Sequence, residues 1–222
     1  MQAGIFNSVA LRKGLANSHA CIPLPFICLH SSKFPGVMEI VDSMGLNQAF
    51  GFQCDWNSAA ILQFYATCFF HNREVTWMTG EARYTTSFSG VLQALGFRSS
   101  GYRIHSANQK DKPKGINDCL RFVASGLESD DRKRKPNDIS IWKQPYQFLY
   151  QCVLRTMYPK SRDKTHCSSS AITLMSLMQE ASQQWLDIPH YLWHEIRMAS
   201  LQTRRHFPHA PYIMALIESR VP

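Results

Sequence analysis

The sequence predicts a mainly α-helical protein, a single multi-helix domain that carries a small β-hairpin near residues 74–87. Hydrophobic residues make up 45% of the 222 residues and charged residues 18%, which is enough apolar surface for a core and argues against wholesale disorder. Apolar residues recur at helical spacing in several segments that end at Gly or Pro. One short stretch instead places β-branched and aromatic residues on both sides of a glycine, as hairpins do.

The chain divides into a leader and one domain. Residues 1–35 are predicted to be an irregular, poorly ordered leader, because their three prolines each block the continuation of a helix. A helical domain is expected over residues 36–220. Within it, the apolar periodicity thins at about residues 98–140, where charged residues, Pro and Gly accumulate. That segment is predicted to be a basic, exposed excursion that is disordered in part, with a short helix near residues 118–125.

Two helices are expected before the hairpin. Residues 36–46 place Val37 and Val41 on one helical face and stop at Gly45. The next helix, over residues 56–70, has Asp55 as its predicted N-cap. Two adjoining apolar stripes give this helix a wide face for the core. The side chains expected to form the framework of the core are Trp56, Phe64, Tyr65, Phe69, Trp77 and Leu92.

The hairpin turn is predicted at Thr79, Gly80 and Glu81. "REVTWM" precedes this turn and "ARYTTSF" follows it. Ser87 or Ser89 is then expected to cap a helix over residues 88–95. Gly96 is expected to end that helix.

The last third of the chain is again predicted to be helical. Asp187 with Pro189 in the first turn is expected to open one helix, and Pro211 opens the last one. Earlier helices are expected at residues 146–157 and 170–181. We expect the helices at 56–70 and 88–95 to pack on these two.

Positive charge is unevenly distributed along the sequence. The net charge is +8, and residues 98–164 alone hold fifteen basic and seven acidic residues, which is also +8. A basic excess of this kind favours polyanionic partners, DNA or RNA in particular, although a solvated basic loop is the equally weighted alternative. The candidate nucleic-acid-binding residues are Lys110, Lys112, Lys114, Arg132, Lys133, Arg134 and Lys135.

Cysteine usage and hydropathy bear on location. The seven cysteines are an odd number without paired spacing, so reduced thiols and an intracellular protein are expected. No apolar run approaches the ~20 residues needed to cross a bilayer. The run from Arg132 to Lys135 resembles an import signal, so a nuclear location is favoured over a cytoplasmic one.

The sequence carries no recognisable catalytic device. It has no G-x-S-x-G, no glycine-rich phosphate loop and no G-x-G-x-x-G, so we predict no enzyme, no cofactor and no small-molecule substrate. His190 and His194 share a helical face, but Glu195 lies about 100° away, and the order differs from the zincin H-E-x-x-H. Polar residues at a helix surface are therefore expected there, not a metal site.

The stretch from Leu62 to Phe97 resembles a plant transposon-derived family, the putative plant transposon proteins, akin to the first open reading frame of Athila-type gypsy-class retrotransposons. The motifs that carry the resemblance are F-Y-A-T at residues 64–67, W-M-T at residues 77–79 and L-G-F at residues 95–97. Fitting segments cover about residues 36–220. The resemblance implies a retroelement origin and a gag-like or DNA-associated role, and it offers no catalytic residues.

Three functions remain open at this point. The leading hypothesis is a non-enzymatic, retroelement-derived protein that binds nucleic acid, self-associates, or does both. A domesticated protein–protein interaction module, anchored on Tyr191, Trp193 and Ile196, is the second. A metal-dependent hydrolase that uses His190 and His194 is the third.

Overall fold

The fold is described over six stretches of the chain. The computed structural model describes residues 32–43, 46–97, 138–142, 144–156, 187–201 and 209–221. Of the residues described, 62% are helical and 16% lie in strands, which confirms the mainly helical class. The described elements are α3 (Pro35–Ser43), α4 (Asn47–Phe50), α5 (Ser58–Thr67), β1 (Phe69–His71), β2 (Glu74–Thr79), β3 (Ala82–Ser87), α6 (Phe88–Leu95), η2 (Ile139–Ile141), α8 (Gln144–Thr156), α10 (Ile188–Leu201) and α11 (Ala210–Glu218).

Several predictions concern parts of the chain outside these stretches. The leader falls almost wholly outside the described residues. The short helix near residues 118–125 and the helix at 170–181 also lie outside them, as does most of the basic excursion. These remain predictions.

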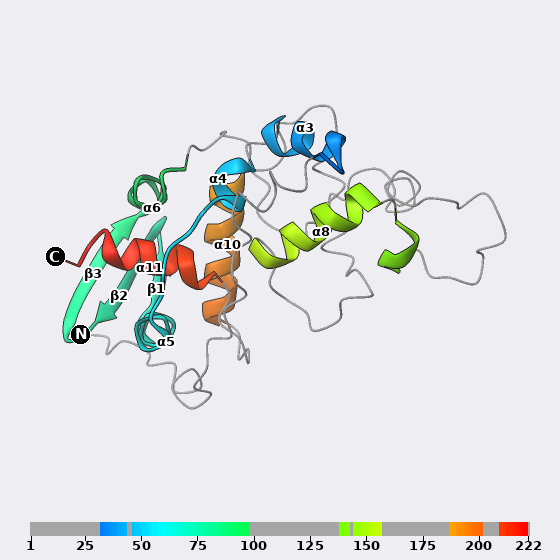
Figure 1. Ribbon diagram of the computed structural model, residues 1–222. Helices are drawn as coiled ribbons and strands as arrows, with labels where there is room; N and C mark the ends of the chain where they lie inside the picture. The colour runs from blue at the N-terminus through cyan, green and yellow to red at the C-terminus, as the bar shows by residue number, and fades with distance from the viewer. Residues whose placement is uncertain are drawn as a thin grey trace.

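A three-stranded antiparallel sheet lies at one end of the molecule, with strand order β1-β2-β3 (Figure 1). The predicted hairpin is confirmed: β2 and β3 pair from Glu74 opposite Ser87 to Thr79 opposite Ala82. Gly80 in the turn has a φ of 60°, a left-handed conformation that glycine adopts without steric cost. The third strand, β1, was not predicted.

Strand β1 exists because α5 ends earlier than its apolar pattern indicates. The Thr67 hydroxyl donates to the carbonyl of Gln63 (2.8 Å) and accepts from the backbone N–H of Met78 on β2 (2.9 Å). Cys68 is then extended, and the chain continues as an edge strand. Phe69 is consequently 62% exposed, so its predicted place in the core framework is wrong, because alternate strand residues face opposite sides of the sheet.

Side-chain hydrogen bonds fasten α5 to the sheet and fix where the helix begins. The Gln63 amide donates to the carbonyl of Gly80 (2.7 Å), and its oxygen accepts from the N–H of the same residue (3.0 Å). At the other end of the helix, the N-cap is Asn57, whose side chain accepts from Ala59 (2.8 Å) and Ala60 (3.1 Å). The predicted cap, Asp55, lies too early in the chain to meet these amides.

Helix α6 follows its predicted boundaries. Ser87 is its N-cap, and the hydroxyl accepts from the backbone N–H of Gly90 at 3.2 Å. Gly96 ends the helix in a left-handed conformation with a φ of 67°. Both boundaries are set by interactions within a few residues: a serine hydroxyl accepts a backbone N–H at the start, and a glycine adopts the left-handed conformation at the end.

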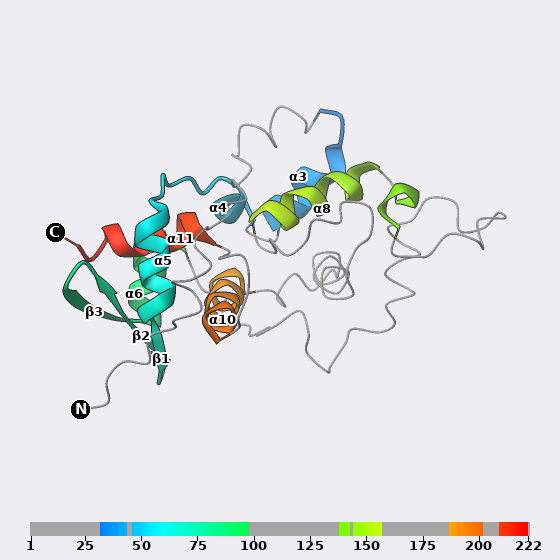
Figure 2. The same ribbon diagram turned by 90° about the horizontal axis from the view of Figure 1, so that it is seen from below.

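The helices pack differently from the prediction. Helix α11 crosses α5 and α6 beside the sheet, and α8 lies along α3 and against α4 (Figures 1 and 2). The extensive contacts of α5 and α6 among the described helices are thus with α11 and not, as expected, with the helix at 146–157, whereas the expected packing on the helix at 170–181 lies outside the described residues. Aromatic stacking contributes to the packing of α8 on α3, because Phe34 beside α3 stacks on Phe148 of α8 with ring centroids 5.3 Å apart.

One core joins both groups of helices. The Tyr212 hydroxyl on α11 donates to the carbonyl of Ala49 on α4 at 3.0 Å, and its ring stacks on Phe52 at 4.7 Å. Predicted framework residues Phe64, Tyr65 and Trp77 are at most 1% exposed, while Trp56 and Leu92 pack on the core from partly buried positions. The largest fully buried side chains are Trp77, Trp142, Tyr65, Tyr150, Tyr191, Tyr212, Phe50, Phe64, Leu46, Ile61 and Leu149.

Candidate functional site

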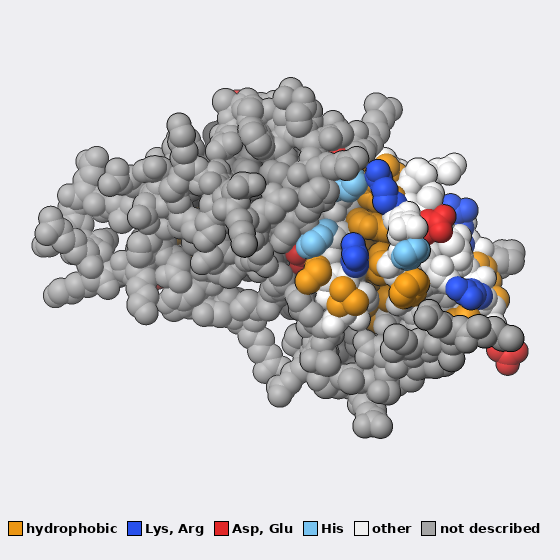
Figure 3. All heavy atoms as spheres, turned by 180° about the vertical axis from the view of Figure 1, so that it is seen from behind, with side chains coloured by type: hydrophobic (Ala, Val, Ile, Leu, Met, Phe, Trp, Pro, Cys, Tyr) orange, Lys and Arg blue, Asp and Glu red, His pale blue; other side chains and the backbone are white. Residues whose placement is uncertain are grey.

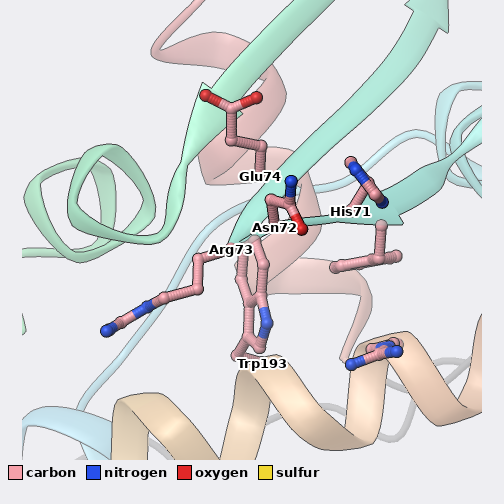
Figure 4. A pocket seen from close by; sticks show the side chains of 7 residues that line it. His71, Asn72, Arg73, Glu74 and Trp193 are labelled. Atoms are coloured by element: carbon pink, nitrogen blue, oxygen red, sulfur yellow. The ribbon is translucent and has the colours of Figure 1, made fainter.

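A recess opens where the turn between β1 and β2 faces α10 (Figure 4). We call it the turn pocket, and its volume is about 320 Å³. The β1–β2 hairpin supplies one wall. Helix α10 supplies the other through two side chains four residues apart, which therefore project from the same helical face. The described residues that line the turn pocket are Phe70, His71, Asn72, Arg73, Glu74, Trp193 and Arg197.

The turn itself has an unusual backbone. Asn72 and Arg73 have φ values of 44° and 62°, both in the left-handed region. Positive φ at the two central residues is what a type I′ hairpin turn requires, and Asn tolerates it. For Arg73 the same conformation costs about 1 kcal/mol. Its carbonyl accepts a hydrogen bond from the backbone N–H of Phe88 (2.7 Å), which ties the turn to the start of α6.

Aromatic rings form the base of the turn pocket. Trp193 lies edge-to-face with Phe70 (centroids 5.0 Å apart, planes at 83°) and with Phe88 (5.4 Å, 79°). Phe88 in turn stacks on the His190 ring at 4.3 Å, and the Arg73 guanidinium carbon lies 5.1 Å from the centre of the Phe88 ring. Such contacts contribute about 0.5–1.5 kcal/mol for each aromatic pair. They hold the half-buried Trp193 in a defined orientation.

Charge at the turn pocket is positive. Arg73 and Arg197 contribute two cations against the carboxylate of Glu74, so the Arg and Glu side chains among the described lining residues sum to +1. Figure 4 shows Arg73 and His71 on opposite sides of Trp193, with Glu74 pointing away from the indole. Figure 3 shows a face on which Lys or Arg and His side chains lie among hydrophobic ones. Guanidinium, indole and amide groups together can hold a planar, anionic ligand.

Helix α10 begins where the sequence predicts, but two of its polar residues are buried instead of exposed. The Asp187 carboxylate accepts from the backbone N–H of His190 (3.1 Å), which caps the helix as expected. His190 and Glu195 are only 9% and 3% exposed, so the prediction that they lie at the helix surface is wrong. His190 is buried because its ring stacks on Phe88. Within the described stretches, no three His, Cys, Asp or Glu side chains gather as a metal site requires.

The surface stripe proposed as a protein-docking anchor is mostly interior. Tyr191 is fully buried and Ile196 is 7% exposed, so these two side chains complete the core. Trp193 alone of the three is partly accessible, and it opens into the turn pocket.

The candidate nucleic-acid-binding residues cannot be placed. Lys110, Lys112, Lys114, Arg132, Lys133, Arg134 and Lys135 all lie outside the described residues. Of the residues of the turn pocket, only Trp193 was singled out from the sequence, as part of a different surface, because the start of the strand that positions the others was predicted to be the end of a helix. A signal did exist in His71, Asn72 and Arg73, three consecutive polar residues between two apolar segments.

Two partly buried thiols have perturbed acidity. Burial, followed by the nearby carboxylate of Glu218, raises the pKa of Cys54 to about 11. The Cys54 thiol lies 3.5 Å from that carboxylate. Burial also raises the pKa of Cys68 to about 12. Together with Cys152, these are thiols rather than disulfides.

Comparison with protein-family models, with curated proteins and with solved structures gave no match. None of the described helices combines the length and apolar character that crossing a lipid bilayer requires. The described residues form a mainly helical fold with a small antiparallel sheet, and arginine and tryptophan side chains line its turn pocket.

Proposed function

We propose that this protein is a non-enzymatic, retroelement-derived protein that binds nucleic acid in a gag-like role. The observation that carries the proposal is that one recess is lined by Arg73, from a strand turn, and by Arg197 and the partly exposed Trp193, from a helix. Cations supply phosphate contacts, and aromatic rings supply stacking surfaces for bases.

The basic middle of the sequence adds independent support. Its excess of eight positive charges over residues 98–164 suits contact with phosphates, and Arg132 to Lys135 are its densest part. The resemblance of residues 36–220 to the plant transposon-derived family points to the same role.

Fluorescence anisotropy of the full chain with labelled DNA and RNA tests the proposal. The logarithm of the observed binding constant should fall linearly with the logarithm of salt concentration. Replacing Arg132 to Lys135 with Ala should make that slope shallower for every strand tested. Absence of salt-sensitive binding at low ionic strength would contradict the proposal.

Self-association is the second candidate, and Phe69 favours it. This side chain is 62% exposed on β1, and no other described strand pairs with the outer edge of β1. An exposed edge strand is a template for pairing with a second chain. Phe69→Lys should lower the sedimentation coefficient if copies pair there, whereas Leu201→Lys, at a 70% exposed site on α10, should leave it unchanged. Equal coefficients for both variants and the parent chain would remove this candidate.

A nuclear location also belongs to the proposal. The chain of 25.4 kDa is small enough to diffuse through nuclear pores, so the test needs a fluorescent fusion too large to diffuse. Replacing Arg132 to Lys135 with Ala in that fusion should abolish nuclear enrichment. Unchanged enrichment would mean that the run is only a solvated loop.

A further inference from the structure

We propose that the turn pocket receives one unpaired base together with its phosphate, so that the protein prefers single-stranded nucleic acid to duplex. This inference rests on the proposed nucleic-acid binding and names the ligand form that the folded core selects. It concerns Trp193, Arg73, Arg197 and Asn72, none of which belongs to the basic run.

The shape of the site favours an unpaired base. The turn pocket is a recess of about 320 Å³, at the lower end of the range of about 300–1,000 Å³ found for small-ligand sites. In a duplex the bases are stacked on one another and paired, so their faces cannot enter a recess. Single-stranded bases are free to splay out and stack on aromatic side chains. Trp193, half-buried and lining the recess, is the side chain placed to receive one.

The lining groups match the other parts of a nucleotide. A guanidinium pairs with phosphate oxygens through two parallel hydrogen bonds, and the recess is lined by Arg197 on α10 and by Arg73 in the turn, whose guanidinium lies over Phe88 at its margin. Asn72 offers an amide donor and acceptor of the kind that reads base edges. The one carboxylate among the described lining residues, Glu74, points away from Trp193, so it does not oppose a phosphate there (Figure 4).

Contacts within the protein hold the groups that line the recess. The hydrogen bond between Phe88 and Arg73 holds the turn, and two edge-to-face contacts hold the indole. The ring of Phe88 also lies beneath the guanidinium of Arg73 and restricts it. A site whose groups are held in place loses little entropy on binding, which favours its use as a ligand site.

The test compares a short fluorescein-labelled single strand with the duplex of the same sequence, as DNA and as RNA, at one ionic strength. The variants are Arg73→Gln, Arg197→Gln and Trp193→Phe in the full chain. Arg83→Gln is the matched control, because Arg83 is an exposed arginine on β3 outside the turn pocket. Circular dichroism and thermal melting of each variant check that it is folded.

The expected result is tighter binding of the single strand by the parent chain. Each pocket arginine variant should lower the salt slope for single strands by at most about 0.7, the value for loss of the one phosphate contact. Trp193→Phe should weaken single-strand binding at least severalfold while leaving the salt slope unchanged. Arg83→Gln should change neither quantity.

Two outcomes separate this inference from the function on which it rests. If no strand binds with salt sensitivity, the proposed function itself fails. If binding is salt-sensitive but the three pocket variants match Arg83→Gln, or if duplex binds as tightly as single strand, the pocket inference is overturned and the function stands. Should Trp193→Phe prove unfolded, the two arginine variants decide.

Discussion

Arg73 holds Phe88 by two contacts of different kinds. Its carbonyl accepts the backbone N–H of Phe88 at 2.7 Å, and its guanidinium lies over the ring of the same residue at 5.1 Å. Phe88 is 4% exposed and also contacts the rings of His190 and Trp193. This one phenylalanine therefore joins the β1–β2 turn, α6 and α10.

Phe88→Leu should destabilise the fold. The change keeps an apolar side chain but removes the ring that contacts Trp193, His190 and the Arg73 guanidinium. The expected loss in free energy of unfolding is about 1–2 kcal/mol, measured by urea denaturation. The matched control is Phe69→Leu at a 62% exposed site, where the change should stay within about 0.5 kcal/mol. Equal effects at the two positions would contradict this account.

Asn57→Ala should weaken the start of α5. The substitution leaves the amides of Ala59 and Ala60 without their side-chain acceptor, at a cost of about 1 kcal/mol. Chemical denaturation of the full chain measures it. Asp55→Ala provides the comparison, because Asp55 is exposed and does not cap the helix. A larger loss at Asp55 than at Asn57 would mean that the helix is capped as the sequence pattern predicted.

Alanine substitutions at two helical glycines should have opposite effects. A Cβ at Gly90 in α6 would collide with the hydroxyl of buried Thr86 and with the guanidinium of Arg220, so Gly90→Ala should cost about 1–3 kcal/mol. At Gly36 in α3 a Cβ meets open space, so Gly36→Ala should stabilise the protein by about 0.5 kcal/mol through helix propensity. Thermal melting of both variants distinguishes the signs, and a stabilising Gly90→Ala would refute the close approach of Thr86.

The reactivity of Cys54 should depend on Glu218. Burial is the larger cause of the raised pKa of about 11, and the Glu218 carboxylate adds to it, against an ordinary value of 9.0. Since the thiolate is the reactive form, Cys54 should alkylate more slowly than an ordinary thiol at a pH below both values. Glu218→Gln removes the negative charge, lowers the pKa and should speed alkylation.

Mass spectrometry of the iodoacetamide-treated Cys54 peptide, sampled over time, measures this rate. Cys68 is an internal reference, because burial and not Glu218 raises its pKa. Its rate should be the same in the parent chain and in Glu218→Gln. Acceleration at both cysteines would indicate general loosening instead of a local electrostatic effect.

Sequence patterns predicted the fold best where the physics is local. Ser87 and Gly96 bound α6 as predicted, and Asp187 caps α10, because each acts on amides or carbonyls within a few residues. Phe69 shows the limit. It continues an apolar helical stripe, yet α5 stops at Thr67 because that hydroxyl accepts the amide of Met78, eleven residues away on a strand.

The turn pocket could not be predicted for the same reason. The pocket needs β1, but the sequence pattern predicted a helix that continues into this strand. It also needs α10, which lies about a hundred residues further along the chain. The burial of His190 likewise depends on Phe88, a contact between distant segments. Trp193 was named from the sequence as a docking anchor, and the hairpin wall was marked only by the polar run at His71, Asn72 and Arg73, although polar turns between strands are common.

The bonds from Gln63 to Gly80 and from Thr67 to Met78 also bear on the order of folding. They span 17 and 11 residues, whereas Tyr212 and Ala49 are 163 residues apart. Closing a short loop costs less chain entropy, so we expect α5, the hairpin and α6 to form a nucleus before α11 docks. Gln63→Ala should then slow refolding in stopped-flow experiments, and Tyr212→Phe should mainly speed unfolding. A slowed refolding for Tyr212→Phe alone would place the nucleus at the C-terminal helix instead.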